Sequence, residues 1–228
     1  MKSNTLTHDQ AYKVYTGNGM LLHVLKISGF GILINLLAFF FYAILFVFIN
    51  GNISEAISEV NGRFALIIFG VSAFIAVAMI DVDYDKQLPG GKYFRTVKGG
   101  YDTYKKMRDS LLIVRMVSLG LIMLWGILCN MVGLLKYPNG VVDVVYIVAP
   151  LMISIGFINL INLIDNYEAM RSVSLLVIVF AYLLGLVYSA FDDADVIVAL
   201  IVAAVSIPFI AVTHKVMLSN YRKNRWDK

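Results

Sequence analysis

The sequence predicts an all-α membrane protein: a polytopic helical bundle with six transmembrane helices and both termini cytoplasmic. Three observations support this fold class: the composition, six long apolar runs and the distribution of Lys and Arg. Of the 228 residues, 60% are hydrophobic and 15% are charged, whereas soluble domains average about 45–50% apolar and about 25% charged residues. A soluble chain of this size cannot bury so much apolar surface, because much of a small domain must face water.

Six apolar runs are long enough to be considered as spans, and the stretch 64–80 is the shortest. They cover residues 27–49, 64–80, 111–135, 141–164, 173–190 and 196–218. A spanning helix needs about 20 mainly apolar residues. Backbone groups in hydrocarbon must be satisfied within the segment, which favours helices, and the alternating segments of a β-barrel are absent. One membrane domain, 1–228, therefore accounts for the chain.

The basic residues predict the orientation, because Lys and Arg are enriched in cytoplasmic segments. With the N-terminus inside, only Arg63 and Lys136 of the 19 Lys and Arg residues fall outside. The net charge of +4 is thus explained by membrane topology, and no nucleic-acid partner is expected. The predicted cytoplasmic parts are an interfacial arm (1–26), a long loop (81–110) and a basic tail (219–228).

The arm and the loop both carry aromatic residues among basic ones. In the arm, apolar positions alternate with polar ones until Gly17 and Gly19 interrupt them, which indicates an interfacial helix followed by a turn. In the loop, a turn at 89–91 and a break at 99–100 precede a segment that can run helically into the third span. Such a loop suits either contact with anionic lipid headgroups or docking into a cytoplasmic partner.

Polar residues inside spans are costly and therefore informative. Five asparagines form the candidate polar set: Asn35, Asn130, Asn159, Asn162 and Asn166. The last three recur at helical spacing, so we expect them on one face of the fourth span. They fit two interpretations, either hydrogen bonds between helices or the lining of a substrate path. Arg115 is expected to reach the inner interface or to pair with an acid such as Asp165.

Motifs of enzymatic chemistry are absent from the sequence. The segment Gly90-Gly91-Lys92 lacks the glycine spacing and the Ser or Thr of a phosphate loop. The three histidines have no metal-ligand spacing. Only the alternating Asp81, Asp83 and Asp85 could suggest metal-assisted phosphate chemistry. No catalytic residue, metal or cofactor is therefore expected.

Two stretches carry a resemblance to a known family. They are Asp85–Arg95 (DKQLPGGKYFR), followed by Lys98–Lys106, and the tail Tyr221–Lys228 (YRKNRWDK). Together with the six runs, they make the chain similar to type-2 (ABC-2-like) bacterial ABC exporter permeases, the small six-span subunits of bacteriocin and lantibiotic immunity systems. The segment Phe191–Asp195 is too short for the re-entrant hairpin that many members place there.

The resemblance implies a permease of the bacterial cytoplasmic membrane that works as a homodimer or with a related chain. It also implies that a separate cytoplasmic subunit hydrolyses ATP, and that the substrate is an amphipathic peptide, lipid or drug. The residues expected to contact that ATP-binding subunit are Leu88, Pro89, Tyr93, Phe94, Arg95, Tyr101 and Tyr104.

Three other functions remain open at this point. A secondary transporter or channel would work without an ATPase and would usually carry more ionisable residues in its spans. A membrane-embedded lipid-modifying enzyme would need one of Asp81, Asp83 and Asp85. A membrane anchor would bind a cytoplasmic partner without transport.

Overall fold

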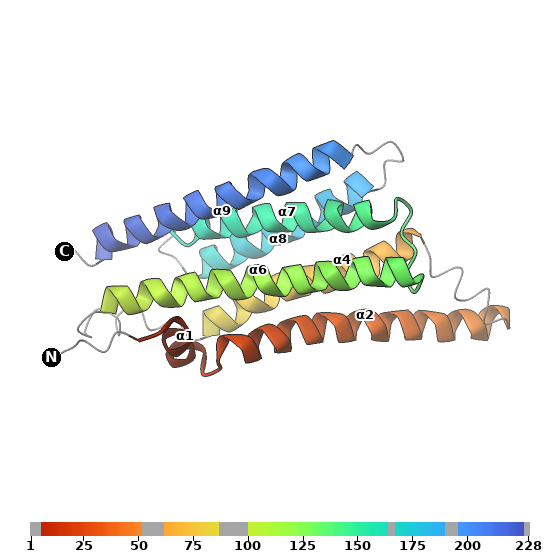
Figure 1. Ribbon diagram of the computed structural model, residues 1–228, viewed down its shortest axis with the longest axis horizontal. Coiled ribbons are helices and arrows are strands. Elements are labelled where there is room, and N and C mark those ends of the chain that lie inside the picture. The colour runs from red at the N-terminus through yellow and green to blue at the C-terminus, as the bar shows by residue number, and fades with distance from the viewer. Residues whose placement is uncertain (1–5, 52–61, 87–99, 164–166, 190–195, 226–228) are drawn as a thin grey trace.

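A computed structural model describes residues 6–51, 62–86, 100–163, 167–189 and 196–225. Within these ranges the chain forms seven α-helices and no β-strand (Figure 1). The helices are α1 (His8–Thr16), α2 (Met20–Asn50), α4 (Arg63–Lys86), α6 (Gly100–Val132), α7 (Val141–Ile161), α8 (Tyr167–Ser189) and α9 (Val196–Arg225). The all-helical prediction is confirmed for the part of the chain described.

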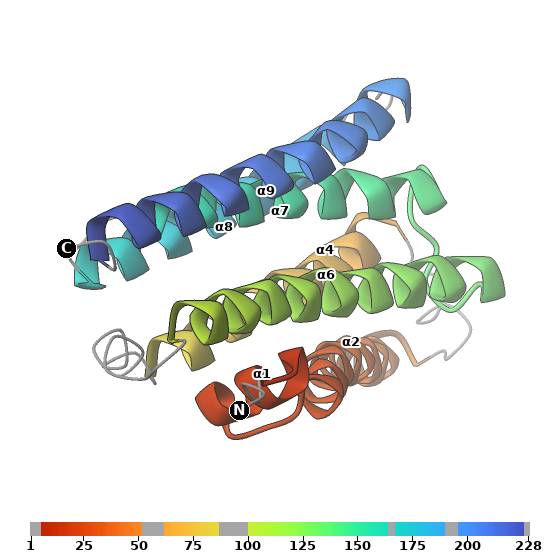
Figure 2. The same cartoon turned by 60° about the vertical axis from the view of Figure 1, so that its left-hand side comes forward.

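The helices form two layers, which Figure 2 separates clearly. One layer holds α7, α8 and α9, and the other holds α1, α2, α4 and α6. The layers meet where α4 packs on α7 and α8, and where α6 packs on α7. The helix α1, the start of α6 and the end of α9 lie at one end of the bundle, here named the terminal end. The opposite end is the distal end.

The short helix α1 begins and ends at well-defined caps. Thr7 and Gln10 form a capping box, and Gly17 ends the helix in the left-handed conformation at φ 74°. Gly19 provides no side-chain cap for α2, but the Met20 N–H donates to Asp9 Oδ1 at 2.8 Å. A carboxylate is favourable at a helix N-terminus, so Asp9 joins the two helices. A helix is present in the arm, with a break at the glycines as expected.

Among the described residues, five helices are long and apolar enough to cross a membrane: α2, α6, α7, α8 and α9. Helix α4 has 24 residues, its apolar sequence runs from Phe64 to Ile80, and its apolar segment within the described residues is Phe64–Ile75. Its last two turns carry acidic residues, Asp81, Asp83 and Asp85, together with Lys86. The expected run 64–80 therefore corresponds to a helix whose apolar part is shorter than the helix itself.

Helix ends differ from the apolar runs because helices continue into polar sequence. Helix α6 begins at Gly100 and α9 continues to Arg225, each well beyond its apolar run. At its other end α6 stops at Val132, because Gly133 takes a left-handed conformation at φ 79°. The N–H groups of Leu134 and Leu135 then donate to the carbonyl oxygen of Cys129, which closes the helix end.

Helices α7 and α8 approach closely at Gly185. A Cβ atom placed there would lie 2.9 Å from the Tyr146 carbonyl oxygen and 3.1 Å from the Ile147 Cα. Both are backbone atoms and cannot rotate away. Small residues permit such approaches between helices, and in a membrane this packing is a principal source of helix association.

We expect Gly185→Ala to lower the stability of the protein by about 1–3 kcal/mol, as overpacking of a close contact does. Thermal unfolding of the purified protein in detergent measures the change. Gly120→Ala is the control, because a Cβ at Gly120 meets nothing within 4 Å. Its effect should be neutral or stabilising by up to about 1 kcal/mol, since Ala is the better helix former. Equal melting temperatures for the two variants would contradict the close approach.

Candidate functional site

The residues expected to couple to an ATP-binding subunit fall into two groups. Leu88, Pro89, Tyr93, Phe94 and Arg95 lie outside the described residues. Tyr101 and Tyr104 are in the first turns of α6, as the helical reading of this segment predicted. Their positions show how that part of the loop is connected to the rest of the bundle.

Tyr101 and Tyr104 both contact the C-terminal end of α9. The Tyr101 hydroxyl donates to the Leu218 carbonyl oxygen at 3.3 Å, and the Arg222 guanidinium lies 5.5 Å from the Tyr101 ring centroid. Tyr104 is 4% exposed and stacks on Tyr221 with 4.1 Å between ring centroids. Tyr104 therefore packs within the chain, whereas Tyr101 is only partly buried.

Two further contacts join the same helices one turn deeper. The Asp109 carboxylate accepts from His214 Nε2 at 2.8 Å. Arg108, which is 5% exposed, donates to the Met217 sulfur. Long side chains thus bridge α6 and α9 at the terminal end.

Helix α1 holds the opposite side of the same α6 segment. Lys106 Nζ donates to the Leu6 carbonyl oxygen at 2.6 Å, and the Ser110 hydroxyl donates to the His8 carbonyl oxygen at 3.2 Å. Ala11 and Tyr12 are completely buried. The first turns of α6 are therefore held between α1 and α9, and we name this assembly of Leu6–Thr16, Gly100–Ser110 and His214–Arg222 the terminal junction.

Arg115 lies one turn beyond the terminal junction and is 5% exposed. Tyr12 is within electrostatic range of its guanidinium, and Tyr12 shares a buried hydrogen bond with His23. Arg115 therefore lies inside the bundle near α1, and its expected reach to the inner interface stays a prediction. The other expected partner, Asp165, lies outside the described residues.

Sequence reasoning missed Asp109, His214 and Met217. One signal for the α6 side was present: Tyr101, Tyr104, Arg108, Arg115 and Ser118 recur at spacings of three, four and seven, which places them on one helical face. No comparable signal identifies the partner positions on α9, because the pairing depends on how two distant helices are rotated.

Asn35 connects three helices of one layer. It is 1% exposed, its amide donates to the Ser72 hydroxyl at 3.5 Å, and its oxygen accepts from Trp125 Nε1 at 3.5 Å. Asn130 has a local role instead, because its amide donates to the Leu135 carbonyl oxygen at 3.2 Å in the turn after α6. Both asparagines therefore have structural partners.

Two of the three asparagines expected on one face of the fourth span are described. Asn159 is buried in α7, and its amide donates to the Thr213 hydroxyl of α9 at 3.5 Å. Helix α7 ends at Ile161, and Asn162 is its C-cap. Asn166 lies outside the described residues, so its place on a common face stays a prediction.

Within the described ranges, no group of three His, Cys, Asp or Glu side chains is placed to hold a metal ion. Cys129 is buried in α6. The residues Asp81, Asp83 and Asp85 belong to the last turns of α4. The side chains of these three residues are outside the described part of the structure, so the lipid-modifying alternative that depends on them stays a prediction.

The outward faces of the bundle are apolar. On α2, Leu37 and Phe41 are 58% and 65% exposed, and on α8 Leu176 is 67% exposed. Soluble monomers rarely expose continuous apolar surface of this extent. Together with the five long apolar helices, this surface is typical of a multi-pass α-helical membrane protein. Comparisons with protein-family models, with curated proteins and with solved structures gave no match.

The Tyr104–Tyr221 stack should contribute a measurable pairwise term to stability. A double-mutant cycle with Tyr104→Leu and Tyr221→Leu is expected to give a coupling energy of about 0.5–1.5 kcal/mol, as other aromatic pairs do. Reversible unfolding in mixed detergent micelles measures it. The pair Tyr104→Leu and Tyr188→Leu serves as the control, because Tyr188 packs on Tyr146 near the distal end and distant changes add. Coupling no larger than in the control pair would contradict the stack.

Replacing Asn35 by Leu should destabilise the protein by about 0.6–1 kcal/mol, the lower part of the range for polar contacts between helices. The lower part is expected because both hydrogen bonds are long, at 3.5 Å. The same unfolding assay measures the change, and Leu37→Ala, on the exposed side of α2, is the control. A stability equal to that of the unaltered protein would show that the two hydrogen bonds do not hold the helices together.

Proposed function

We propose that the protein is the membrane subunit of an ATP-driven exporter in a bacterial cytoplasmic membrane. It forms the translocation path for an amphipathic peptide, lipid or drug, and a separate cytoplasmic subunit hydrolyses ATP. Two copies of the chain, or this chain and a related one, complete the transporter. The proposal rests on the resemblance to ABC-2-like permeases and on the structure of α6.

The continuous helix α6 is the observation that carries the proposal. It starts at Gly100 inside the proposed coupling loop and continues without a break to Val132. Its first turns are held between α1 and α9 in the terminal junction. A force applied to the loop is therefore passed to three helices at once, as coupling to an ATPase requires.

The proposed topology has six spans with both termini in the cytoplasm. Helix α4 supplies the span that this topology needs in addition to the five apolar helices. Its 24 residues correspond to about 36 Å, more than the hydrocarbon thickness of about 30 Å. The terminal end then faces the cytoplasm, because the basic residues of α1, of the start of α6 and of the end of α9 are there.

The proposed path runs between the two layers, past the asparagines that link helices. Asn35 joins α2 to α4 and α6, and Asn159 joins α7 to α9. Opening of the path would exchange these long hydrogen bonds for contacts with substrate. An amphipathic substrate suits a route that has few buried charges. In the described part of the chain, the buried Lys or Arg residues are Arg108 and Arg115.

A copurification experiment tests the proposal. The tagged chain, extracted from its native membrane in mild detergent, should bring down a stoichiometric soluble protein with a phosphate-loop motif. Changing Pro89, Tyr93 and Phe94 to Ala should remove that protein, because these residues form the proposed docking segment. Pro138→Ala, an exposed proline in the turn between α6 and α7, is the control and should retain it.

Two results would overturn the exporter proposal. If the chain purifies alone and intact, ion-flux and lipid-turnover assays become the appropriate next measurements. If a partner without a phosphate loop is recovered, the protein is better explained as an anchor for that partner.

A further inference from the structure

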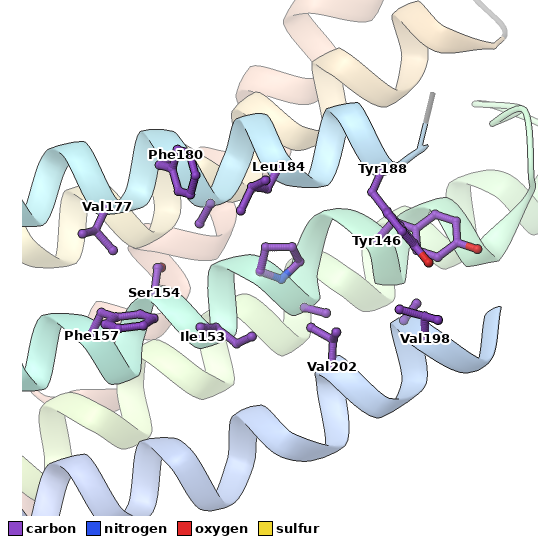
Figure 3. A pocket seen from close by; sticks show the side chains of 14 residues that line it. Tyr146, Ile153, Ser154, Phe157, Val177, Phe180, Leu184, Tyr188, Val198 and Val202 are labelled. Carbon is purple, nitrogen blue, oxygen red and sulfur yellow. The ribbon is translucent and has the colours of Figure 1, made fainter. Parts of the chain in front are cut away.

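A groove lies between α7, α8 and α9 in the distal half of the bundle. Its volume is about 350 Å³, and it follows α7 from Tyr146 to Phe157 (Figure 3). Val177 and Leu184 line it from α8, and Val202 lines it from α9. The lining of the groove includes no residue of the terminal junction and none of the asparagines that link helices.

The sequence creates this groove by placing small residues where three helices face one another. Ala149, Ala181 and Ala199 line it, one from each helix, and each leaves space that a larger side chain would fill. Tyr146 and Tyr188 form an edge-to-face pair, 4.8 Å between centroids, at its distal limit. At the other limit, Phe157 packs against Phe209 with centroids 5.2 Å apart.

The lining accepts hydrocarbon and little else. The Ser154 hydroxyl already donates to the Leu151 carbonyl oxygen at 2.6 Å. The other side-chain oxygens in the lining are the two tyrosine hydroxyls, at the distal limit. A polar ligand placed deeper would lose its hydrogen bonds without replacement, which is costly. The occupant must therefore be apolar along its length and polar only at the tyrosine end.

The length of the groove fits one leaflet of a bilayer. The interval from Tyr146 to Phe157 corresponds to about 16 Å along a helix, and half of the hydrocarbon core is about 15 Å. Tyrosines are enriched at the membrane interface because the ring is apolar and the hydroxyl is wet. The two tyrosines therefore lie at the depth of a lipid's glycerol region, and Phe157 lies near the depth of its chain end.

We propose that this groove binds a single acyl chain of a phospholipid from the leaflet at the distal end of the bundle. The chain lies along α7 with its terminal methyl at Phe157, and the ester region contacts Tyr146 and Tyr188. This inference goes beyond the proposed transport function and does not depend on it, because a lipid site of this kind suits any multi-pass protein.

Photolabelling with depth-specific lipids tests the site. The full chain is reconstituted into vesicles of phosphatidylethanolamine and phosphatidylglycerol that contain a trace of phosphatidylglycerol with a diazirine on one acyl chain. With the diazirine at the chain end, α7 should be labelled around Ile153 and Phe157. With the diazirine next to the ester, label should move to Tyr146 and Tyr188. Unlabelled lipid should compete for both.

Filling the groove should remove the labelling. Val202→Trp places an indole in the groove and should reduce label on α7 several-fold. Val205→Trp is the matched control, because Val205 is on the same helix, is 56% exposed and does not line the groove; it should retain the label. Ala199→Leu provides a second filling variant if Val202→Trp does not elute as a monodisperse species.

Two outcomes would overturn the proposal. One is equal labelling of α7 in the Val202→Trp and Val205→Trp proteins. The other is labelling of the unaltered chain that ignores the diazirine depth and follows only surface exposure. Either result would mean that the groove is in contact with bulk lipid and holds no particular chain.

Discussion

The close approach of helices to α7 is the constraint on which the bundle depends. Lipid tails are as apolar as leucine, so burial of apolar side chains does little to hold membrane helices together, and packing must supply the attraction. Gly185 allows α8 to contact the α7 backbone. Gly156 does the same for α9, since a Cβ there would overlap the Phe209 ring. The remaining layer reaches α7 through α4 and α6.

The two ends of the bundle are held together in different ways. At the terminal end, charged and aromatic side chains bridge α6 to its neighbours, with the Asp109–His214 pair and the Tyr104–Tyr221 stack as the main contacts. In the distal half, α7, α8 and α9 leave a groove between small residues. The terminal end therefore depends on contacts between particular side chains, whereas α7 and α8 depend on a close backbone approach at Gly185.

Much of the fold could be predicted, because lipid requires long apolar helices and these are visible in the sequence. The arm was also predictable, from the glycines at 17 and 19, and the Thr7–Gln10 capping box was a readable signal for its start. The helix ends were less predictable. The polar turns of α6 between Gly100 and Ser110 were expected to be helical, but the apolar run 196–218 gave no sign that α9 continues to Arg225.

The candidate site was predictable only where a single helix carries the signal. Asn35 and Asn159 were singled out because buried amides are costly in a span, and both link helices in the structure. Asn162 is the C-cap of α7, and nothing near it in the sequence marks the end of the helix at Ile161. The partnership of Asp109 with His214 joins positions 105 residues apart. It depends on the rotation of two helices, which no local pattern records.

The length of α6 has a mechanical consequence. Its 33 residues correspond to about 50 Å, whereas the hydrocarbon core of a bilayer is about 30 Å thick. Helix α6 packs on α1, α2, α4 and α7 along this length. It is one unbroken helix, so a displacement of its start beside Gly100 also displaces the contacts that its deeper turns make with α7.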